Sequence, residues 1–314
     1  MILKTEGLTK IFDTGFGKTV AAVEDLDLQV AAGEIFGFVG PNGAGKTTTI
    51  KMLMGLIFPT RGRAFIFDEP IPSQRAKARL GYLPENPSYQ DFLTGAEAMH
   101  FFATLSGVPR PEQPRRIDEL LGLVGLSDAA DRQLRKYSKG MQQRLGIAQA
   151  LVSQPALVVL DEPMSGLDPI GRREIRDLIL ELKKRGTTVF FSTHILPDVE
   201  TLCDRVGIII QGRLRDVGRL GELLSARVTS VELTASLPAG RREPLGRGRV
   251  IAEDGDRVTA IFDDAGAADA AVAAVLAAGG RLVALTPHRE TLEDFFLRRL
   301  GEGGGAGEAT RASG

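Results

Sequence analysis

A glycine-rich run near the N-terminus has the residue types and spacing of a phosphate-binding loop. The run matches every fixed position of the P-loop template and reads Gly40, Pro41, Asn42, Gly43, Ala44, Gly45, Lys46, Thr47 and Thr48. Its glycines allow consecutive backbone N–H groups to surround phosphate oxygens, and Lys46 adds a positive charge for the outer phosphates. Thr47 is expected to ligate Mg²⁺ through its hydroxyl. The run therefore predicts nucleotide binding, and a glycine-rich turn that only resembles the motif is the less favoured interpretation.

Two adjacent carboxylates follow an apolar stretch later in the chain. Residues 157–160 have the composition of a buried strand, and Asp161 and Glu162 come directly after it. Because parallel strands deliver their carboxyl ends to a ligand crevice, we expect Asp161 to hold the water shell of Mg²⁺. Glu162 would then accept a proton from the water that attacks the γ-phosphate of ATP. The alternative is a buried strand that ends in two solvated acids.

Three further motifs indicate which class of P-loop protein this is. Residues 137–144 read YSKGMQQR at the head of a helical pattern, residues 165–168 read SGLD, and residues 192–194 read STH after a strand. In this order they resemble the signature motif, the D-loop and the switch histidine of ATP-binding cassette (ABC) ATPases, over about residues 3–218. The resemblance implies a P-loop ATPase fold with a RecA-like mixed sheet. It also implies a homodimer in which two cassettes sandwich two ATP molecules head to tail.

The resemblance assigns roles in nucleotide binding to individual residues. Ser138 and Gly140 of one cassette would face the γ-phosphate held by Lys46 of the other, and Asp168 of the D-loop would lie at the same interface. His194 would hydrogen-bond the γ-phosphate as a third catalytic group beside Glu162 and Lys46. Taken alone, Ser138 would more often be a helix cap and His194 a structural histidine.

One aromatic residue is a further candidate for nucleotide binding, whereas two histidines are not. Phe12 falls where the family places the ring that stacks on adenine, although Phe16 is a nearby competitor and a core role is the alternative. His100 and His288 lie outside any motif, and we expect them to be structural.

Two positions depart from the usual family pattern. The family usually has glutamine where this chain has Glu85, which could reach Mg²⁺ and the nucleotide through oxygen but lacks an amide donor. Lys139 and Met141 replace the usual glycine and glutamine of the signature. Lys139 could approach the phosphate of the partner cassette or face solvent, and the sequence leaves both open.

The elements that must position these residues form an α/β pattern. Apolar runs at residues 35–39, 156–160, 188–192 and 206–210 predict a parallel sheet. Residues 2–9 and 21–30 alternate as strands of an antiparallel β flank do. From about residue 86 to residue 140 the strand signal disappears, and Thr94 with Glu97 predicts a capping box in a helical subdomain. We expect residues 1–218 to form one ATP-binding domain.

The C-terminal third has a different character. Residues 219–300 predict a small α+β domain, with strands near residues 228–234, 249–252, 257–262 and 282–285 and a helix over residues 265–278. Residues 291–300 would form its last helix, and the glycine-rich residues 301–314 are expected to be disordered. Residues 290–297, ETLEDFFL, resemble the closing helix of daunorubicin-resistance-type ATPases, which drive ABC-2 type exporters. An amphipathic helix that packs on the small domain is compatible with that resemblance.

Composition limits the partners. The chain has 39 Lys and Arg against 40 Asp and Glu, so we expect no nucleic-acid partner. Cys203 is the single cysteine, which excludes an intramolecular disulfide and fits a reducing compartment. No apolar run approaches the ~20 residues that cross a bilayer. The resemblance therefore implies a peripheral ATPase at the cytoplasmic face of the inner membrane, paired with an ABC-2 type permease that exports a drug, an antibiotic or a lipid.

Two other functions remain to be compared with this one. Soluble ABC ATPases of DNA repair or translation share the core motifs, but they carry coiled-coil inserts, zinc cysteines or two cassettes in one chain. This sequence has one P-loop, one cysteine and no heptad insert. A P-loop kinase would not account for the signature, the D-loop and the switch histidine.

Overall fold

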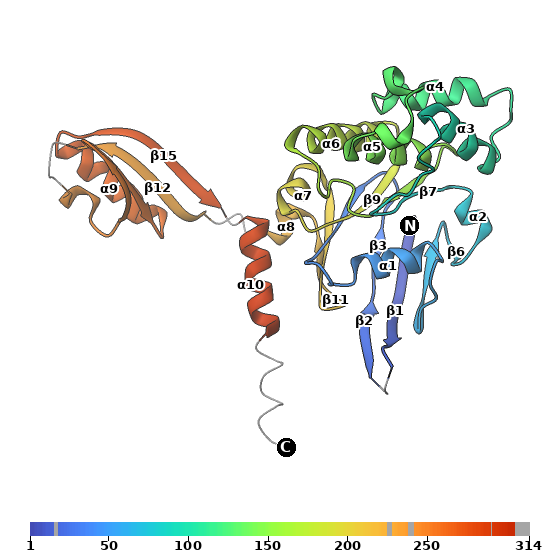
Figure 1. Cartoon of the computed structure of the whole chain (residues 1–314). Helices are drawn as coiled ribbons and strands as arrows, with labels where there is room; N and C mark the ends of the chain where they lie inside the picture. Colours follow the sequence, from blue (N-terminus) through green and yellow to red (C-terminus); the bar gives the residue numbers. More distant parts are fainter. Residues whose placement is uncertain (16–17, 225–227, 238–241, 290, 305–314) are drawn as a thin grey trace. The chain divides into compact units, whose positions relative to one another are not determined.

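The computed structural model of the chain describes residues 1–15, 18–224, 228–237, 242–289 and 291–304. They divide into two units, Met1–Leu220 and Gly221–Gly314, with the boundary inside the short helix α8 (Leu220–Leu223). Figure 1 shows the elements of both units. Every residue of the P-loop, the acid pair, the signature motif, the D-loop and the switch histidine belongs to the first unit.

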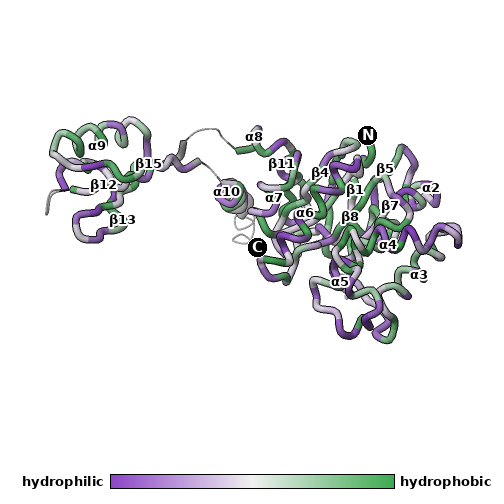
Figure 2. The backbone as a smooth tube through the Cα atoms, turned by 90° about the horizontal axis from the view of Figure 1, so that it is seen from above, coloured by the Kyte–Doolittle hydropathy of each residue, from purple (hydrophilic) through white to green (hydrophobic). Residues whose placement is uncertain are grey.

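A six-stranded sheet forms the centre of the first unit. Its order is β11-β10-β4-β9-β8-β7, and β11 (Arg213–Gly218) is the one strand that runs antiparallel to its neighbour. The parallel strands are β4 (Ile35–Val39), β7 (Leu80–Leu83), β8 (Leu157–Leu160), β9 (Thr188–Thr193) and β10 (Arg205–Ile210). The four apolar runs in the sequence are therefore central strands, as predicted. Their residues are mostly apolar, as the green tube at β4 and β8 in Figure 2 shows, because both faces of a parallel sheet are buried.

An antiparallel sheet flanks this core, also as predicted. It contains β1 (Leu3–Asp13), β2 (Thr19–Leu26), β3 (Gln29–Val30), β5 (Arg61–Ile66) and β6 (Glu69–Pro70). Side chains of β1, β4, β9 and helix α1 (Lys46–Leu53) share one hydrophobic core. Phe36 and Phe190 stack within it, with ring centroids 5.7 Å apart. This packing holds the β4–α1 connection, which is the P-loop.

Helices on the other side of the central sheet form a second core. The helical subdomain contains α3 (Gly95–Leu105), α4 (Gln113–Leu123), the 3-10 turns Ser127–Ala129 and Leu134–Lys136, and the start of α5 (Lys139–Ala150). Thr94 and Glu97 form the predicted capping box at the start of α3. The remaining helices of this unit are α2 (Gln74–Lys77), α6 (Pro169–Lys184) and α7 (Leu196–Leu202). Residues of α3 to α6 pack together with β8 and β9.

The second unit is a four-stranded antiparallel sheet covered on one face by a helix. The strand order is β13-β14-β12-β15, with β12 (Val228–Ser236), β13 (Arg249–Asp254), β14 (Arg257–Phe262) and β15 (Arg281–Arg289). A 3-10 turn at Glu243–Leu245 precedes β13, and α9 (Ala265–Ala277) supplies the covering helix. Ala268, Ala271 and Val275 of α9 pack on Leu233 and Phe262 of the sheet. The antiparallel sheet with a covering helix that the C-terminal sequence predicted is therefore present.

The last helix corrects one expectation. Helix α10 (Leu292–Gly304) continues through residues that the composition had assigned to a disordered tail, and residues 305–314 lie outside the described part of the chain. Thr291 and Asp294 exchange backbone and side-chain hydrogen bonds of 3.0 and 3.1 Å at its start. Once a helix has begun, each further residue adds a backbone hydrogen bond, and a glycine costs only about 1 kcal/mol. Leu292, Phe295 and Phe296 of this helix are buried, as the apolar residues of an amphipathic helix are.

Within the described residues, no helix combines the length and the apolar character that crossing a bilayer requires.

Candidate active site

The P-loop connects β4 to α1 and requires glycine at two positions of close approach. A Cβ on Gly40 would lie 2.3 Å from the carbonyl oxygen of Ile209, so no side chain fits there. Gly45 has a φ of 105°, and a Cβ on it would lie 2.4 Å from the carbonyl oxygen of Ala22. Gly45 caps α1 without any side-chain hydrogen bond. The first backbone N–H groups of α1 therefore have no side-chain acceptor and can bind an anion.

A cavity of about 350 Å³ lies over this loop. Its lining contains most of the predicted nucleotide ligands, namely Asn42, Gly43, Ala44, Gly45, Lys46, Thr47, Thr48, Glu85, Glu162 and His194. Ala22 and Ser165 also line the cavity and were not predicted. Ser165 stands in the SGLD motif, which could have indicated it, whereas Ala22 belongs to the antiparallel flank and has no sequence signal. Residues from both sheets and from α1 thus converge on one cavity.

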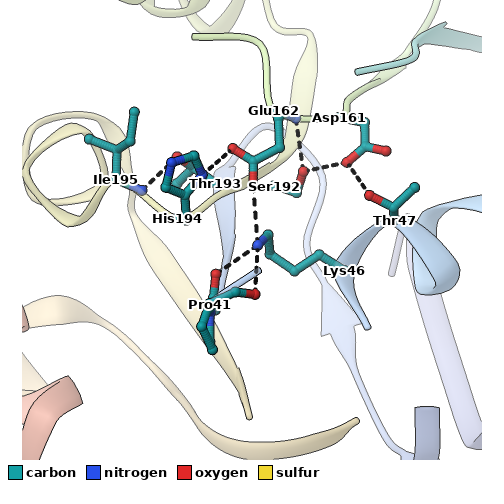
Figure 3. Close-up of polar contacts among 10 residues, drawn as sticks. Pro41, Lys46, Thr47, Asp161, Glu162, Ser192, Thr193, His194 and Ile195 are labelled. Carbon is teal, nitrogen blue, oxygen red and sulfur yellow. Dashed lines mark hydrogen bonds and ion pairs between the residues drawn. The ribbon is translucent and has the colours of Figure 1, made fainter. Parts of the chain in front are cut away.

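Lys46 is buried and spans the cavity between the loop and the acid pair (Figure 3). Its Nζ donates to the carbonyl oxygens of Gly40 at 2.7 Å and Pro41 at 3.1 Å. It also forms an ion pair with Oε1 of Glu162 at 3.1 Å. Gly40 and Pro41 therefore contact the lysine and are absent from the cavity lining. An arriving phosphate has to replace at least one of these partners.

Asp161 lies at the centre of a buried hydroxyl network. Its Oδ1 accepts from the hydroxyl of Ser192 at 2.7 Å and faces the hydroxyl of Thr47 at 3.3 Å. The backbone N–H of Glu162 in turn donates to Ser192 Oγ at 2.9 Å. Burial raises the pKa of Asp161, and the two hydroxyl contacts oppose that rise in part. Ser192 is a site residue that the motif search did not single out.

The contact between Ser192 and Asp161 follows from strand register. Strands β8 and β9 are parallel neighbours, and Leu160 pairs with Phe191. The next residue of each strand, Asp161 and Ser192, therefore emerges at the same edge of the sheet. Ser192 was visible in the sequence as the residue two places before His194. Its role depends on a pairing between segments thirty-one positions apart, so spacing alone does not reveal it.

The oxygen donors at this edge suit a small hard cation. Asp161 is 1% exposed, and its Oδ2 has no hydrogen-bond partner among the described residues. An unpaired buried carboxylate oxygen is costly unless a cation or water meets it. With the Thr47 hydroxyl beside it, the pair fits Mg²⁺, which prefers oxygen ligands and keeps several waters. Among the described residues, no group of three or more His, Cys, Asp or Glu side chains gathers as metal ligands.

Glu162 faces both a cation and an imidazole. Its Oε1 contacts Lys46, and its Oε2 lies 2.9 Å from Nδ1 of His194. Glu162 also has a φ of 49°, a left-handed conformation that is rare outside glycine and concentrates at functional sites. The side chain is 6% exposed and is held on two sides. This geometry orients the carboxylate toward the cavity that Lys46 and His194 share.

Besides Gly40, Pro41 and Asp161, four predicted ligands are absent from the cavity lining. Ser138 caps α5 by accepting from the N–H of Met141 at 3.2 Å, and Gly140 follows in the first turn. Asp168 caps α6 by accepting from the N–H of Gly171 at 2.8 Å. Phe12 lies on β1, 39% exposed, with Lys10 Nζ 5.0 Å from its ring centroid.

Four other positions considered in the sequence analysis do not line the cavity or lie outside the described residues. Phe16 lies outside the described residues. His100 is exposed on α3, and Nε2 of His288 lies 3.2 Å from Glu232 in the second unit. The side chain of Lys139 crosses Gly166, where an added Cβ would lie 2.3 Å from Nζ.

Sequence relatives agree with this geometry. Residues 23–165 match the family model described as ABC transporter. An ABC transporter ATP-binding protein of Synechocystis, which is uncharacterised, is 42% identical over 96% of this chain and 86% of its own length. The bacitracin transport ATP-binding protein BcrA of Bacillus licheniformis is 44% identical over 68% of each chain. A fluoroquinolones export ATP-binding protein of Mycobacterium tuberculosis is 42% identical over 66% of this chain and 68% of its own.

Solved structures share the fold of the first unit. The ATP-binding subunit of an ABC transporter superposes with a TM-score of 0.63 at 31% identity, covering 71% of this chain and 92% of that chain. The dimeric cassette MJ0796 bound to ADP and phosphate superposes with a TM-score of 0.64 at 23% identity, covering 69% of this chain and 98% of that chain. The second likeness concerns the fold alone. With the relatives above, the chain belongs to the ABC transporter ATP-binding proteins and is an ABC ATPase.

Proposed function

We propose that this chain hydrolyses ATP to drive an ABC-2 type exporter of a drug, an antibiotic or a lipid. Relatives named for bacitracin transport and fluoroquinolone export support the direction of transport. The motifs at residues 137–141 and 290–297 support the same branch of the family. The observation that carries the ATPase mechanism is the position of Glu162 between Lys46 and His194 at the mouth of the phosphate loop.

In this mechanism each group has one task. The backbone of the P-loop and Lys46 bind the β- and γ-phosphates, and Lys46 leaves Glu162 as it takes up phosphate. Glu162 is then free to accept a proton from the attacking water, while His194 orients that carboxylate through Nδ1. Thr47 and Asp161 would hold Mg²⁺. When bound, Mg²⁺ neutralises charge on the phosphate oxygens.

A homodimer completes the site in this proposal. Ser138 is exposed at the start of α5 and lies outside the cavity of its own chain, so a second cassette is needed to bring a signature motif to the phosphates. The N-terminus of α5, with Ser138 and Gly140, then meets the γ-phosphate across the interface. The dimeric arrangement of MJ0796 with ADP and phosphate supports this assembly.

The proposed permease partner places the protein at the cytoplasmic face of the inner membrane. The first unit has an apolar groove of about 220 Å³. Its lining includes Tyr89, Leu93, Ala98, Phe101 and Phe102, and Tyr89 follows Glu85 closely in the sequence. Phe101 is exposed. A cytoplasmic segment of the permease that buries these rings would couple the nucleotide site to the membrane.

A pull-down tests the transporter assignment. Tagged Glu162→Gln protein is incubated with ATP and Mg²⁺ in gently solubilised membranes of its host, and the proteins that accompany it are identified. A multi-span membrane protein is expected, and its identity would narrow the cargo. Ribosomes or DNA-repair proteins instead would contradict the transport proposal without affecting the ATPase.

Drug susceptibility tests the export branch. Cells that express the chain with its captured permease should resist an exported compound, and cells that carry Glu162→Gln with the same permease should not. Equal susceptibility across a panel of antibiotics and lipid-active compounds would argue against efflux. The ATPase rate of the purified wild-type protein serves as the control for correct folding.

A further inference from the structure

His194 depends on the helix that follows it for its position. Its side chain is 39% exposed, whereas the Glu162 carboxylate that it meets at 2.9 Å is 6% exposed. Helix α7 begins directly after the histidine, with Ile195 at its N-cap and no side-chain hydrogen bond at that end. A helix of seven residues is marginal by itself, so contacts with the rest of the fold decide where α7 and the histidine before it lie.

Asp198 supplies a polar contact of this kind. It lies in the first turn of α7, is 3% exposed, and has its Oδ1 3.5 Å from a guanidinium nitrogen of Arg176 on α6. Val199 and Leu202 of the same helix are buried as well. Because hydrophobic attraction has no preferred direction, whereas a buried charge is stable only beside its partner, the ion pair is the contact that fixes α7 against α6.

Helix α6, on which Arg176 stands, is anchored to the D-loop. One turn before Arg176, Nε of Arg172 donates to the carbonyl oxygen of Leu167 at 3.2 Å. The D-loop continues the turn that starts at Glu162. The segments that carry Glu162 and His194 are therefore joined twice, once by their own contact and once by way of the ion pair between the two helices.

Stability alone does not account for this ion pair. Oδ2 of Asp198 has no hydrogen-bond partner among the described residues. Burial raises the pKa of Asp198, and the charges of Arg176 and Arg172 oppose that rise only in part. Apolar residues of similar volume in place of a buried ion pair often leave a fold equally stable or more stable. The geometry of the pair is therefore the property that remains to be explained.

We infer that Asp198 is a positioning residue for ATP hydrolysis, which through Arg176 holds α7 so that His194 stays beside Glu162. This inference rests on the proposed mechanism and deepens it. When phosphate draws Lys46 away from Glu162, His194 is the side-chain partner that this carboxylate keeps among the described residues. The position of α7 then decides whether the imidazole stays within hydrogen-bond distance of the base.

Steady-state hydrolysis of ATP tests the inference. In Asp198→Asn, kcat should fall about tenfold, because a small misplacement of a group at the reacting centre slows the chemical step. The KM for ATP and the affinity for ADP should stay within about twofold of wild type, and the melting temperature at pH 7 should not fall. Asp198→Glu keeps the charge and should recover most of kcat. The control Asp177→Asn removes one carboxylate of an exposed pair with Arg173 on α6 and should leave kcat unchanged.

An apolar replacement of the pair separates positioning from packing. Arg176→Met combined with Asp198→Leu should melt near the wild-type temperature and should be as slow as Asp198→Asn. A wild-type kcat in the double variant or in Asp198→Asn would overturn the inference. A joint loss of melting temperature, ADP affinity and kcat in Asp198→Asn would also overturn it, because that pattern is a general loss of structure.

A readout that needs no turnover follows the histidine itself. The chain has three histidines, so the imidazole resonances of His194 can be separated by NMR from those of His100 and His288. In Asp198→Asn the signals of His194 should move and the other two should not. Unchanged His194 signals would overturn the positioning role. Hydrolysis at the wild-type rate by Glu162→Gln, with His194 signals that do respond to Asp198→Asn, would overturn the proposed mechanism and leave the positioning contact in place.

Discussion

At the scale of single residues, the site is organised around opposed charges in a small buried volume. Lys46 and Glu162 are 5% and 6% exposed and neutralise each other in the absence of nucleotide. Removing either partner of a buried pair leaves the other charge uncompensated. In the proposed mechanism, phosphate that recruits Lys46 releases Glu162 from this contact. Substitutions at these residues are therefore expected to separate binding from turnover.

Glu162→Gln should retain ATP binding and lose turnover by about a hundredfold or more, because the amide cannot accept a proton from water. Its oxygen can still accept from Lys46, so the fold of the loop is preserved. Steady-state phosphate release and equilibrium ATP binding measure the two properties separately. Hydrolysis at the wild-type rate would contradict the assignment of Glu162 as the base.

At the scale of elements, the signature helix contacts the D-loop of its own chain. The side chain of Lys139, the first residue of α5, lies across Gly166, whose φ is 68°. The sequence left the direction of Lys139 open, and within one chain it lies along this turn. The contact places Lys139 beside the segment that carries Ser165 into the cavity.

Gly166→Ala should impair both stability and ATPase activity, because the new Cβ meets Lys139 and the left-handed backbone itself costs about 1–2 kcal/mol. Gly186→Ala is the matched control, since Gly186 has a φ of 82° but nothing within 4 Å of an added Cβ. Melting temperature should fall in both variants, and ATPase activity only in Gly166→Ala. Adding Lys139→Ala to Gly166→Ala should raise the melting temperature only by the part that the contact with Lys139 had cost, because the backbone strain stays; no rise at all would show that the lysine is not an obstacle.

A buried ion pair joins α7, which follows His194, to α6, which follows the D-loop. Asp198 is 3% exposed, with Oδ1 3.5 Å from Arg176 and Oδ2 without a hydrogen-bond partner among the described residues. Burial raises the pKa of Asp198, and the positive charges of Arg176 and Arg172 only partly oppose that rise. The fold is therefore less stable with Asp198 ionised than with Asp198 protonated.

The pH dependence of stability tests this account. Because the folded-state pKa is raised, Asp198 stabilises the fold at low pH, and this contribution is lost as the pH rises through the folded-state pKa. Asp198→Asn should therefore be at least as stable as wild type at pH 7, and any advantage should shrink as the pH falls toward the ordinary aspartate range. Urea unfolding at several pH values measures the difference. A variant that is less stable than wild type at pH 7 and whose deficit shrinks in acid would contradict the sign.

At the scale of the whole molecule, the proposed sandwich makes each active site a composite of two chains. A heterodimer of Ser138→Arg and Lys46→Ala subunits contains one site with both defects and one site with neither. Mixing the two inactive variants should therefore restore ATPase activity to about half that of wild type at most, scaled by the fraction of heterodimers. Full activity in the mixture, or none at any ratio, would count against head-to-tail assembly.

Much of the nucleotide site could be predicted because its signals are local. The P-loop, the acid pair and the capping box of Thr94 and Glu97 each lie within a few consecutive residues, so backbone geometry and side-chain type decide them together. The apolar runs of the central sheet were equally clear, since strands buried on both faces leave no polar alternation. The end of helix α10 was not predicted from the sequence. Composition alone does not show that a helix which has already begun will continue into glycine-rich residues.

What the sequence determined by itself was the set of motifs present, namely a phosphate loop, an acid pair after a buried strand, a signature motif and a histidine after the next strand. Tertiary structure alone decided which groups meet. The register of β7, β8 and β9 places Glu85 and Ser192 beside the acid pair, and folding lays Lys139 across Gly166. These contacts join segments far apart in the chain, and their energies depend on burial and distance. The burial of these groups and the distances between them are set only when the strands have paired and the two hydrophobic cores have formed.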